Sequence, residues 1–168
     1  VIKRKKMERR KEIKKIKIFG VVSALAIAAT LGLGSYTDAK VNKAAKKLKD
    51  NGYNFDFNII GNGDMFDTLS NMIKEYSLGD CVHLLGAKPS NEVRQYMEKA
   101  SVYLFTSDKY EGWGAVLNES MNSGCVVVAS HTVGAVPYML KDGENGYVYH
   151  SGNIEELYEK VKTLLDNT

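Results

Sequence analysis

Residues 106–130 read TSDKYEGWGAVLNESMNSGCVVVAS and combine a glycine-bracketed turn, a helix start and an apolar strand. Glu111 and Glu119 flank the turn, with seven residues between them. The apolar residues 126–129, which follow Gly124 and Cys125, predict a buried strand. A turn, a short helix and a buried strand in this order are typical of a parallel α/β sheet.

The chain from residue 41 onward repeats this alternation. Short apolar runs predict strands at 55–60, 81–85, 102–106, 126–129 and 147–149. Amphipathic spacing predicts helices at 41–50, after a cap at Asp64, from Ser90 or Asn91, at 115–122, at 136–140 and after Asn153, which forms a capping box with Glu156. We therefore expect an α/β fold with a Rossmann-like, doubly wound parallel sheet that helices cover on both faces.

The candidate site lies where the predicted strands end. A doubly wound sheet binds its ligand at the carboxyl ends of its strands. The loops expected at this edge are Gly61–Gly63, Gly86–Lys88, Thr106–Ser107 and Ser130–His131.

The opening stretch suits a phosphorylated ligand. Gly112 and Gly114 allow a sharp turn and a close approach to the backbone, and a helix from Ala115 points N–H groups outward, where a phosphate fits. Glu119 lies about 7 Å along the helix axis from Gly114, which suits a carboxylate bound to ribose hydroxyls. Glu111, at the strand end, is placed to reach a sugar beyond the phosphates. By spacing alone, two ordinary surface acids are an equally good interpretation.

These motifs resemble the E-x7-E signature of retaining glycosyltransferases that have the two-domain GT-B architecture. The similarity runs from about Val41 to Asn167 in the family's order. Besides the two glutamates, it rests on the segments 57–63 (FNIIGNG), 82–86 (VHLLG), 134–137 (GAVP) and 142–146 (DGENG). The resemblance implies that this sheet is the carboxyl-terminal, nucleotide-sugar-binding half of a GT-B fold.

The resemblance also implies a role for each matching residue. Glu111 would be the catalytic residue at the donor sugar, and Glu119 would bind the ribose. The other implied donor-binding residues are Gly112, Trp113, Gly114 and Ala115 near the sugar and diphosphate, Gly61 and Gly63 in the glycine turn, and Gly86, Ala87 and Lys88 at the base.

Members of this family transfer a sugar from a nucleotide-sugar to an acceptor hydroxyl with retention, generally without a required metal. The donor expected here is a UDP- or GDP-sugar, the acceptor is a glycan or a lipid-linked glycan, and the setting is cell-surface polysaccharide biosynthesis. In the front-face displacement ascribed to the family, the leaving phosphate helps to deprotonate the acceptor, so no protein nucleophile is needed. The sequence offers no nucleophilic triad and no metal cluster: we expect His83 in the core, and His131 and His150 to stand alone.

Three departures from the family pattern concern the site. The family's first strand is followed by an Arg and a Lys that neutralise the diphosphate, whereas no Arg lies between Arg10 and Arg94. Lys40 replaces that Lys only under an alignment that shortens the following helix. Tyr138 follows Pro137 where the family usually has Glu, and the amino-terminal, acceptor-binding domain is absent from the 168 residues.

The positive net charge is local. Residues 1–17 hold ten Lys or Arg, and the remainder of the chain is net acidic. The basic run lacks interleaved aromatic residues, so nucleic acid is not an expected partner; a solvated helix face or an anionic membrane surface explains it better. Cys81 and Cys125 lie in apolar runs and are interpreted as reduced, buried thiols of a cytoplasmic protein.

Residues 1–40 remain open to three interpretations. The uncharged run Ile18–Gly34 after the basic stretch has the order of a secretory signal or membrane anchor, yet it suits a buried strand and loop equally well. In the first interpretation, the chain is the carboxyl half of a longer enzyme and has its first strand at Ile16–Val22. In the second, it is a membrane-anchored single-domain relative. In the third, two segments have been joined by truncation, assembly error or design. We favour the first and divide the chain into 1–40 and a nucleotide-sugar-binding domain at 41–168.

A non-catalytic function is the main alternative. It is a degenerate module that binds a nucleotide-sugar without transferring the sugar, and it could be anchored in a membrane. The missing Arg favours this alternative, whereas the presence of Glu111 and Glu119 is evidence against it. A non-enzymatic membrane scaffold is a third possibility and rests only on residues 1–34.

Overall fold

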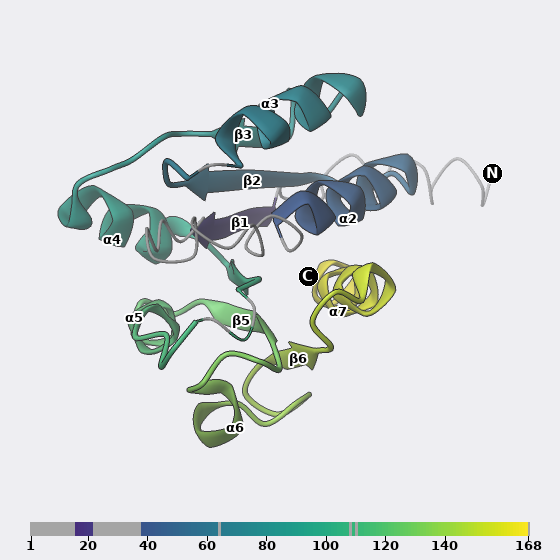
Figure 1. The fold of residues 1–168 in the computed structure, drawn as a ribbon. Helices are drawn as coiled ribbons and strands as arrows, with labels where there is room; N and C mark the ends of the chain where they lie inside the picture. Colours follow the sequence, from purple (N-terminus) through teal and green to yellow (C-terminus); the bar gives the residue numbers. More distant parts are fainter. Residues whose placement is uncertain (1–15, 22–37, 64, 108, 110, 168) are drawn as a thin grey trace.

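The computed structural model describes residues 16–21, 38–63, 65–107, 109 and 111–167. Six strands form one sheet in the order β3-β2-β1-β4-β5-β6, and all five pairings are parallel. The strands are β1 (Ile16–Val21), β2 (Phe55–Ile60), β3 (Val82–Leu84), β4 (Val102–Phe105), β5 (Val126–Ser130) and β6 (Tyr147–Tyr149). This is the doubly wound strand order, which reverses between β1 and β4, so the predicted fold class is confirmed (Figure 1).

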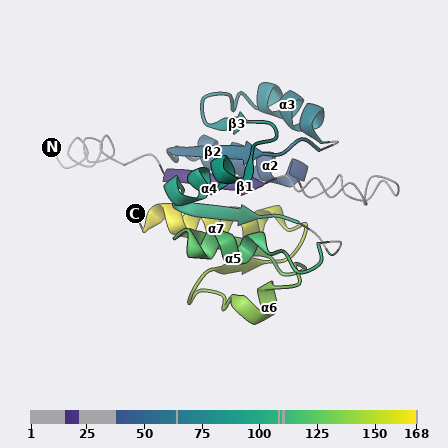
Figure 2. The ribbon, with the colours of Figure 1, turned by 90° about the vertical axis from the view of Figure 1, so that its left-hand side faces the viewer.

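Among the described residues, five helices connect the strands and a sixth, α7, follows β6; together they cover both faces of the sheet. They are α2 (Asp38–Asp50), α3 (Phe66–Glu75), α4 (Ser90–Lys99), α5 (Val116–Asn122), α6 (Val136–Met139) and α7 (Ile154–Asp166). Figure 2 shows α4 and α5 in front of the sheet, with α2 and α7 behind it. Strands buried on both sides lose the alternation of apolar and polar residues, which is why β4 has four consecutive buried residues.

The uncharged run after the basic segment begins as the central strand of the sheet. Ile18 of β1 pairs with Phe57 of β2 and with Val102 of β4, and its side chain is 2% exposed. This agrees with the interpretation that placed a first strand at Ile16–Val22. Residues 1–15 and 22–37, which hold the rest of the basic and uncharged runs, lie outside the described residues. Within the described part, no helix has the length and apolar character needed to cross a membrane.

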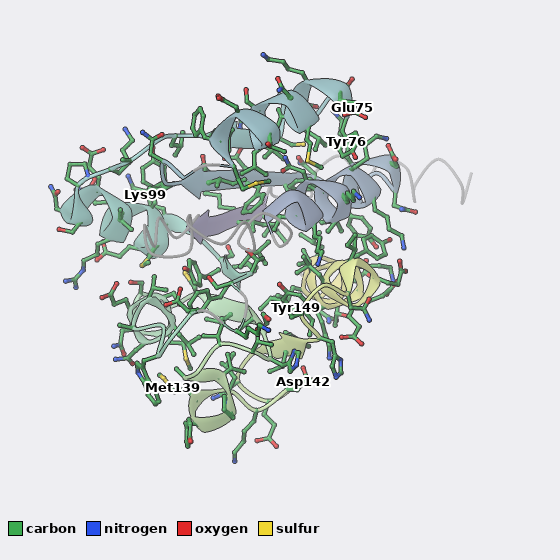
Figure 3. All side chains as sticks on the ribbon, viewed as in Figure 1. Glu75, Tyr76, Lys99, Met139, Asp142 and Tyr149 are labelled. Atoms are coloured by element: carbon green, nitrogen blue, oxygen red, sulfur yellow. The ribbon has the colours of Figure 1, made fainter. Side chains whose placement is uncertain are left out.

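The core has two parts, one on each face. The first lies between the sheet and α2, α3 and α7, and includes Phe55, Leu69 and Leu157. Tyr149 of β6 belongs to it and lies between the sheet and α7 (Figure 3). The second lies on the face of α4, α5 and α6, around Phe105 and Leu117. As predicted, both cysteines are buried thiols outside any disulfide.

The helix ends differ from the predictions in three places. Helix α2 begins at Asp38, before the predicted range, and α3 follows Met65, whose side chain makes no capping hydrogen bond; the predicted cap, Asp64, lies outside the described residues. Asn153 Oδ1 accepts from the Glu156 N–H at 3.1 Å, which is one half of the predicted capping box. The other half is not formed: the Asn153 N–H donates to the His150 carbonyl at 2.9 Å, and the Glu156 carboxylate accepts from the His150 N–H at 2.7 Å.

Candidate functional site

Two loops at the carboxyl edge of β2 and β3 are joined by a backbone hydrogen bond. The Gly61 N–H donates to the Gly86 carbonyl at 3.0 Å. Both glycines have a positive φ angle, +141° and +68°, in a region of backbone conformation that residues other than glycine rarely adopt. The structure thus brings together the predicted glycine turn and the predicted base-binding loop.

The predicted base-binding residues Ala87 and Lys88 lie in the loop between β3 and α4. Ala87 is exposed, and Lys88 is half-buried. Lys88 Nζ lies 3.5 Å from Glu92 Oε2, one turn along the chain. Because a partly exposed ion pair is weak, it does not hold the lysine side chain in one conformation. Gly63 lies in the neighbouring loop, where its carbonyl accepts from the Phe66 N–H at 2.9 Å.

On the other side of β1, the Glu111 loop is held by the loop that follows β5. The Gly134 N–H donates to the Gly112 carbonyl at 3.0 Å, and the Ala135 N–H donates to the Trp113 carbonyl at 2.9 Å. A Cβ at Gly134 would lie 2.1 Å from the Gly112 oxygen, so only glycine fits there. Residues 112–113 and 134–135 therefore form one joint between two loops.

The two glycines of the turn have different roles. Gly114 has φ +78°, and a Cβ there would lie 2.8 Å from the Phe105 ring and 2.9 Å from Val133. Gly112 has no positive φ, and a Cβ there would meet nothing within 4 Å. Within the predicted turn, the left-handed backbone conformation occurs at Gly114 and not at Gly112. The open space beside Gly112 still lets a ligand approach its backbone.

Helix α5 begins directly after this turn, and Glu119 lies in its first turn. Ala115 is the N-cap residue of α5 and makes no side-chain capping hydrogen bond. The Leu117 N–H donates to the Gly114 carbonyl at 2.9 Å, and the Glu119 N–H donates to the Ala115 carbonyl at 3.2 Å. Glu119 is exposed, so its carboxylate is accessible beside the start of the helix.

The carboxylates of Glu111 and Glu119 both affect the pKa of the same buried residue of β4, Tyr103. Burial first, and then the charges of Glu111 and Glu119, raise the pKa of the Tyr103 phenol. Tyr103 is fully buried in the core beneath α5. Both carboxylates therefore lie within electrostatic range of Tyr103, the second residue of β4. Glu111 itself is half-buried.

An exposed aromatic pair lies next to the joint. The rings of Trp113 and Tyr138 have centroids 5.7 Å apart and an interplanar angle of 32°. The side chains are 56% and 78% exposed, although large apolar groups are usually covered. The sequence identified Tyr138 only as a departure from the family pattern. Its pairing with Trp113 arises from the contact between the two loops, which no local pattern predicts.

The histidines differ from the sequence-based expectation. His83 is only half-buried, and its Nε2 lies 2.9 Å from Asp56 Oδ1. His131 and His150, expected to stand alone, have ring centroids 5.1 Å apart, and His150 Nδ1 lies 2.9 Å from Glu156 Oε2. The turns after β5 and β6 cause this proximity, because the two strands are neighbours in the sheet. In the described part of the chain, no three His, Cys, Asp or Glu side chains form a group that could hold a metal ion.

Two further features lie outside the predicted site. Lys40, in the first turn of α2, lies beside the loop after β6: a Cβ on Gly152 would be 2.8 Å from its Nζ. A hollow of about 180 Å³ lies at the amino-terminal halves of β1 and β2 and the last turn of α4. Its lining is Lys17, Ile18, Asp56, Asn58, Tyr96, Lys99 and Ala100, and it includes none of the predicted donor-binding residues.

The chain is similar to known glycosyltransferases over most of its length. It is 30% identical over 142 residues to the amylovoran biosynthesis glycosyltransferase AmsK of Erwinia amylovora, covering 82% of this chain and 33% of that protein. It is 32% identical over 109 residues to an N-acetylgalactosaminyltransferase of Campylobacter jejuni that acts on a diphospho-undecaprenol-linked saccharide, covering 65% of this chain and 29% of that protein. The chain thus spans about a third of the length of these relatives.

Solved structures show the same fold. The structure of a Staphylococcus aureus TarM variant, crystallised with fondaparinux, α-GlcNAc-glycerol and UDP, matches with a TM-score of 0.78 at 22% identity, over 91% of this chain and 29% of that chain. The fold is therefore the Rossmann-like α/β half of a GT-B glycosyltransferase. The family model "Glycosyl transferases group 1" matches residues 39–168. The chain belongs to the group 1 glycosyl transferase family.

Proposed function

We propose that the chain is the donor-binding domain of a retaining glycosyltransferase that moves a sugar from a nucleotide-sugar to an acceptor hydroxyl. The observation that carries the proposal is the turn at Gly114, which places Glu111 before the start of α5 and Glu119 in its first turn. A diphosphate at the helix start would have the ribose on one side and the transferred sugar on the other. Glu119 binds the ribose in this scheme, and Glu111 contacts the sugar as the catalytic residue.

The remaining donor contacts come from the loops of the carboxyl edge. Backbone groups of Gly112, Trp113, Gly114 and Ala115 bind the diphosphate and sugar, since N–H groups at a helix start favour negative charge. The loop of Gly86, Ala87 and Lys88 binds the base, and the neighbouring glycine turn of Gly61 and Gly63 also contacts the donor. The hydrogen bond between Gly61 and Gly86 keeps that half of the site in place. No metal or other cofactor takes part, and the donor is a UDP- or GDP-sugar.

The acceptor is a glycan or a lipid-linked glycan. The TarM structure holds UDP, and the Campylobacter relative acts on a lipid-linked saccharide, which supports both halves of this assignment by similarity. Closure of an acceptor-binding domain over the site is required for efficient transfer. We place the reaction in the cytoplasm, which agrees with the two buried, free thiols. Association with a membrane is compatible with this location.

The alternative is a degenerate module that binds the nucleotide-sugar without transferring it. It is supported by the absence of any Arg between Arg10 and Arg94, since the diphosphate then lacks that positive group. A thermal-shift panel of UDP, GDP, ADP and CMP identifies the base, and a hydrolysis assay on the matching nucleotide-sugar without acceptor tests for activity. Selective stabilisation with hydrolysis supports the enzyme. Stabilisation without hydrolysis is expected of the module and of a donor domain that reacts only together with its acceptor-binding domain, and no stabilisation by any nucleotide contradicts both functions.

A further inference from the structure

The hollow at the amino-terminal halves of β1 and β2 has no part in the proposed function. It has a volume of about 180 Å³ and is closed on one side by the last turn of α4. Ligand pockets typically measure about 300–1,000 Å³, so this hollow suits a molecule smaller than a nucleotide-sugar. None of the predicted donor-binding residues lines it, and the donor loops follow the opposite, carboxyl ends of the strands.

The sheet beneath the hollow is polar, although its strands are central ones. Lys17 of β1 is the register partner of Asp56 of β2. In the same way, Asn58 of β2 is the register partner of His83 of β3. The residues that alternate with them, such as Phe57, belong to the core on the opposite face. Strands of a doubly wound parallel sheet are normally apolar on both faces, so polar side chains at these positions are an informative exception.

The carboxylate that lines the hollow is bonded to its neighbours in the sheet. Asp56 Oδ1 lies 2.9 Å from His83 Nε2. Asp56 Oδ2 accepts from Asn58 Nδ2 at 3.3 Å. Both oxygens of Asp56 therefore have partners on β2 and β3.

Two lysines line the same hollow without a carboxylate partner. They are Lys17 and Lys99, which lies in the last turn of α4 (Figure 3). Other lysines of the described residues pair with an Asp or a Glu, namely Lys46, Lys47, Lys49, Lys88, Lys141, Lys160 and Lys162. In that part of the chain, neither Lys17 nor Lys99 has such an ion pair. With two ammonium groups and one carboxylate, the lining of the hollow has a net positive charge.

We propose that this hollow binds a small phosphorylated polyol, such as a sugar phosphate, at a site separate from the donor site. A phosphate monoester carries about two negative charges at neutral pH, and lysine binds phosphate as a point charge. Asn58 and Tyr96, which also line the hollow, carry polar groups of the kind that bond to hydroxyls. The carboxyl end of a helix by itself disfavours an anion, so binding depends on Lys17 and Lys99.

Calorimetric titration tests the site while the donor site is filled. The chain, saturated with the nucleoside diphosphate that stabilises it, is titrated with glucose 6-phosphate, glycerol 3-phosphate and inorganic phosphate. Glucose and glycerol are the uncharged controls. We expect saturable binding of at least one of the two esters, weaker binding of inorganic phosphate and no binding of the controls. The affinity should fall as the salt concentration rises, because salt screens exposed charges.

Three variants assign the binding to the two lysines. Lys17→Gln and Lys99→Gln each remove one charge and should weaken binding of the ester roughly 3- to 10-fold. Lys74→Gln is the matched control, because Lys74 is exposed on α3, which packs on the opposite face of the sheet. It should bind the ester as the wild type does. All three variants should retain the melting temperature and the nucleotide affinity of the wild type.

Proton NMR locates the bound ester, because the chain contains only three histidines. His83 contacts Asp56 of the hollow, whereas His131 and His150 follow the carboxyl ends of β5 and β6. Addition of the ester should shift the ring signals of His83 and leave those of the other two unchanged. A shift of His131 or His150 without a shift of His83 would overturn the proposal.

Three further results would overturn the proposal and leave the proposed function in place. They are nucleotide binding with no binding of either ester, equal affinity for the ester in wild type and both lysine variants, and binding of inorganic phosphate as tight as that of the esters. Failure of the proposed function is distinguishable, because no nucleotide would then stabilise the chain. The esters are in that case titrated into the chain without nucleotide, and the same results decide.

Discussion

The Gly134 N–H lies 3.0 Å from the Gly112 carbonyl oxygen, and the Gly134 Cα is so close to that oxygen that a Cβ would approach it to 2.1 Å. This contact joins the loop after β5 to the loop that carries Glu111. It therefore links the geometry of the candidate site to a residue outside the E-x7-E segment.

The substitution Gly134→Ala should open this joint. The clash is with backbone atoms, which cannot rotate away, so the two loops must separate and lose their hydrogen bonds. We expect a loss of stability of about 1–3 kcal/mol and weaker nucleotide binding, measured by thermal denaturation and calorimetric titration. Gly112→Ala is the stability control, because its Cβ would meet nothing within 4 Å. Equal melting temperatures for the two variants would contradict the joint.

The substitution Ile18→Ala tests the position of β1 in the centre of the sheet. Ile18 is 2% exposed between β2 and β4, and truncation of such a residue leaves a cavity that costs about 2–5 kcal/mol. Lys17→Ala, next to it but exposed, should change the free energy of unfolding by less than about 0.5 kcal/mol. Urea denaturation of both variants provides the comparison. Similar midpoints would show that residues 16–21 do not form a buried strand.

The ion pair of Asp142 and Lys160 should make a small, pH-dependent contribution to stability. The hydrogen bond from Lys160 lowers the pKa of Asp142 from its usual 3.8. A lowered folded-state pKa stabilises the fold above the unfolded-state value, and this stability is lost as the pH falls through the folded-state pKa. Because both side chains are partly exposed, the effect should stay below about 1 kcal/mol.

The matching variant is Asp142→Asn, which removes the charge and retains an oxygen for the Val148 N–H bond. The difference in melting temperature between wild type and variant should be constant from neutral pH down to about the usual pKa of a carboxyl group and should shrink below it. A difference that grows in acid would contradict the sign of the pKa shift.

Both thiols should resist modification in the folded chain. Cys125 is 7% exposed, donates to the Met97 carbonyl at 3.2 Å, and has its pKa raised by burial, so little thiolate is present to react. Labelling by a disulfide reagent should be at least roughly 100-fold slower than in denaturant, because it requires opening of the fold. Fast labelling of one thiol under native conditions would show that its strand opens locally.

Most of the sheet follows from local sequence. Strand β2 alternates apolar and polar residues, and β4 and β5 are short apolar runs, too short for an ordinary helix. Strand β1 could not be distinguished in this way, since the uncharged run Ile18–Gly34 suits a membrane segment as well as a strand. Its place in the sheet depends on pairing with Phe57 and Val102, which are distant in sequence.

The candidate site was predictable where it depends on local geometry. The turn at Gly114 and the start of α5 place Glu119 as the spacing predicts. The contacts between loops were not predictable, because residues 112 and 134 meet only when β4 and β5 are neighbours. For the same reason the sequence does not reveal that Gly134 packs against the Gly112 backbone, or that His131 lies against His150.

Calorimetric titration of the selected nucleoside diphosphate into wild type, Glu119→Ala and Glu75→Ala tests the donor site most directly. Glu75 is an exposed carboxylate at the far end of α3 and serves as the matched control (Figure 3). Loss of a charged hydrogen-bond acceptor should weaken binding by roughly 10-fold or more in Glu119→Ala, with an unchanged melting temperature and no effect in Glu75→Ala. Equal affinity of wild type and Glu119→Ala would contradict the assignment of Glu119 to the ribose and, with it, the proposed donor site.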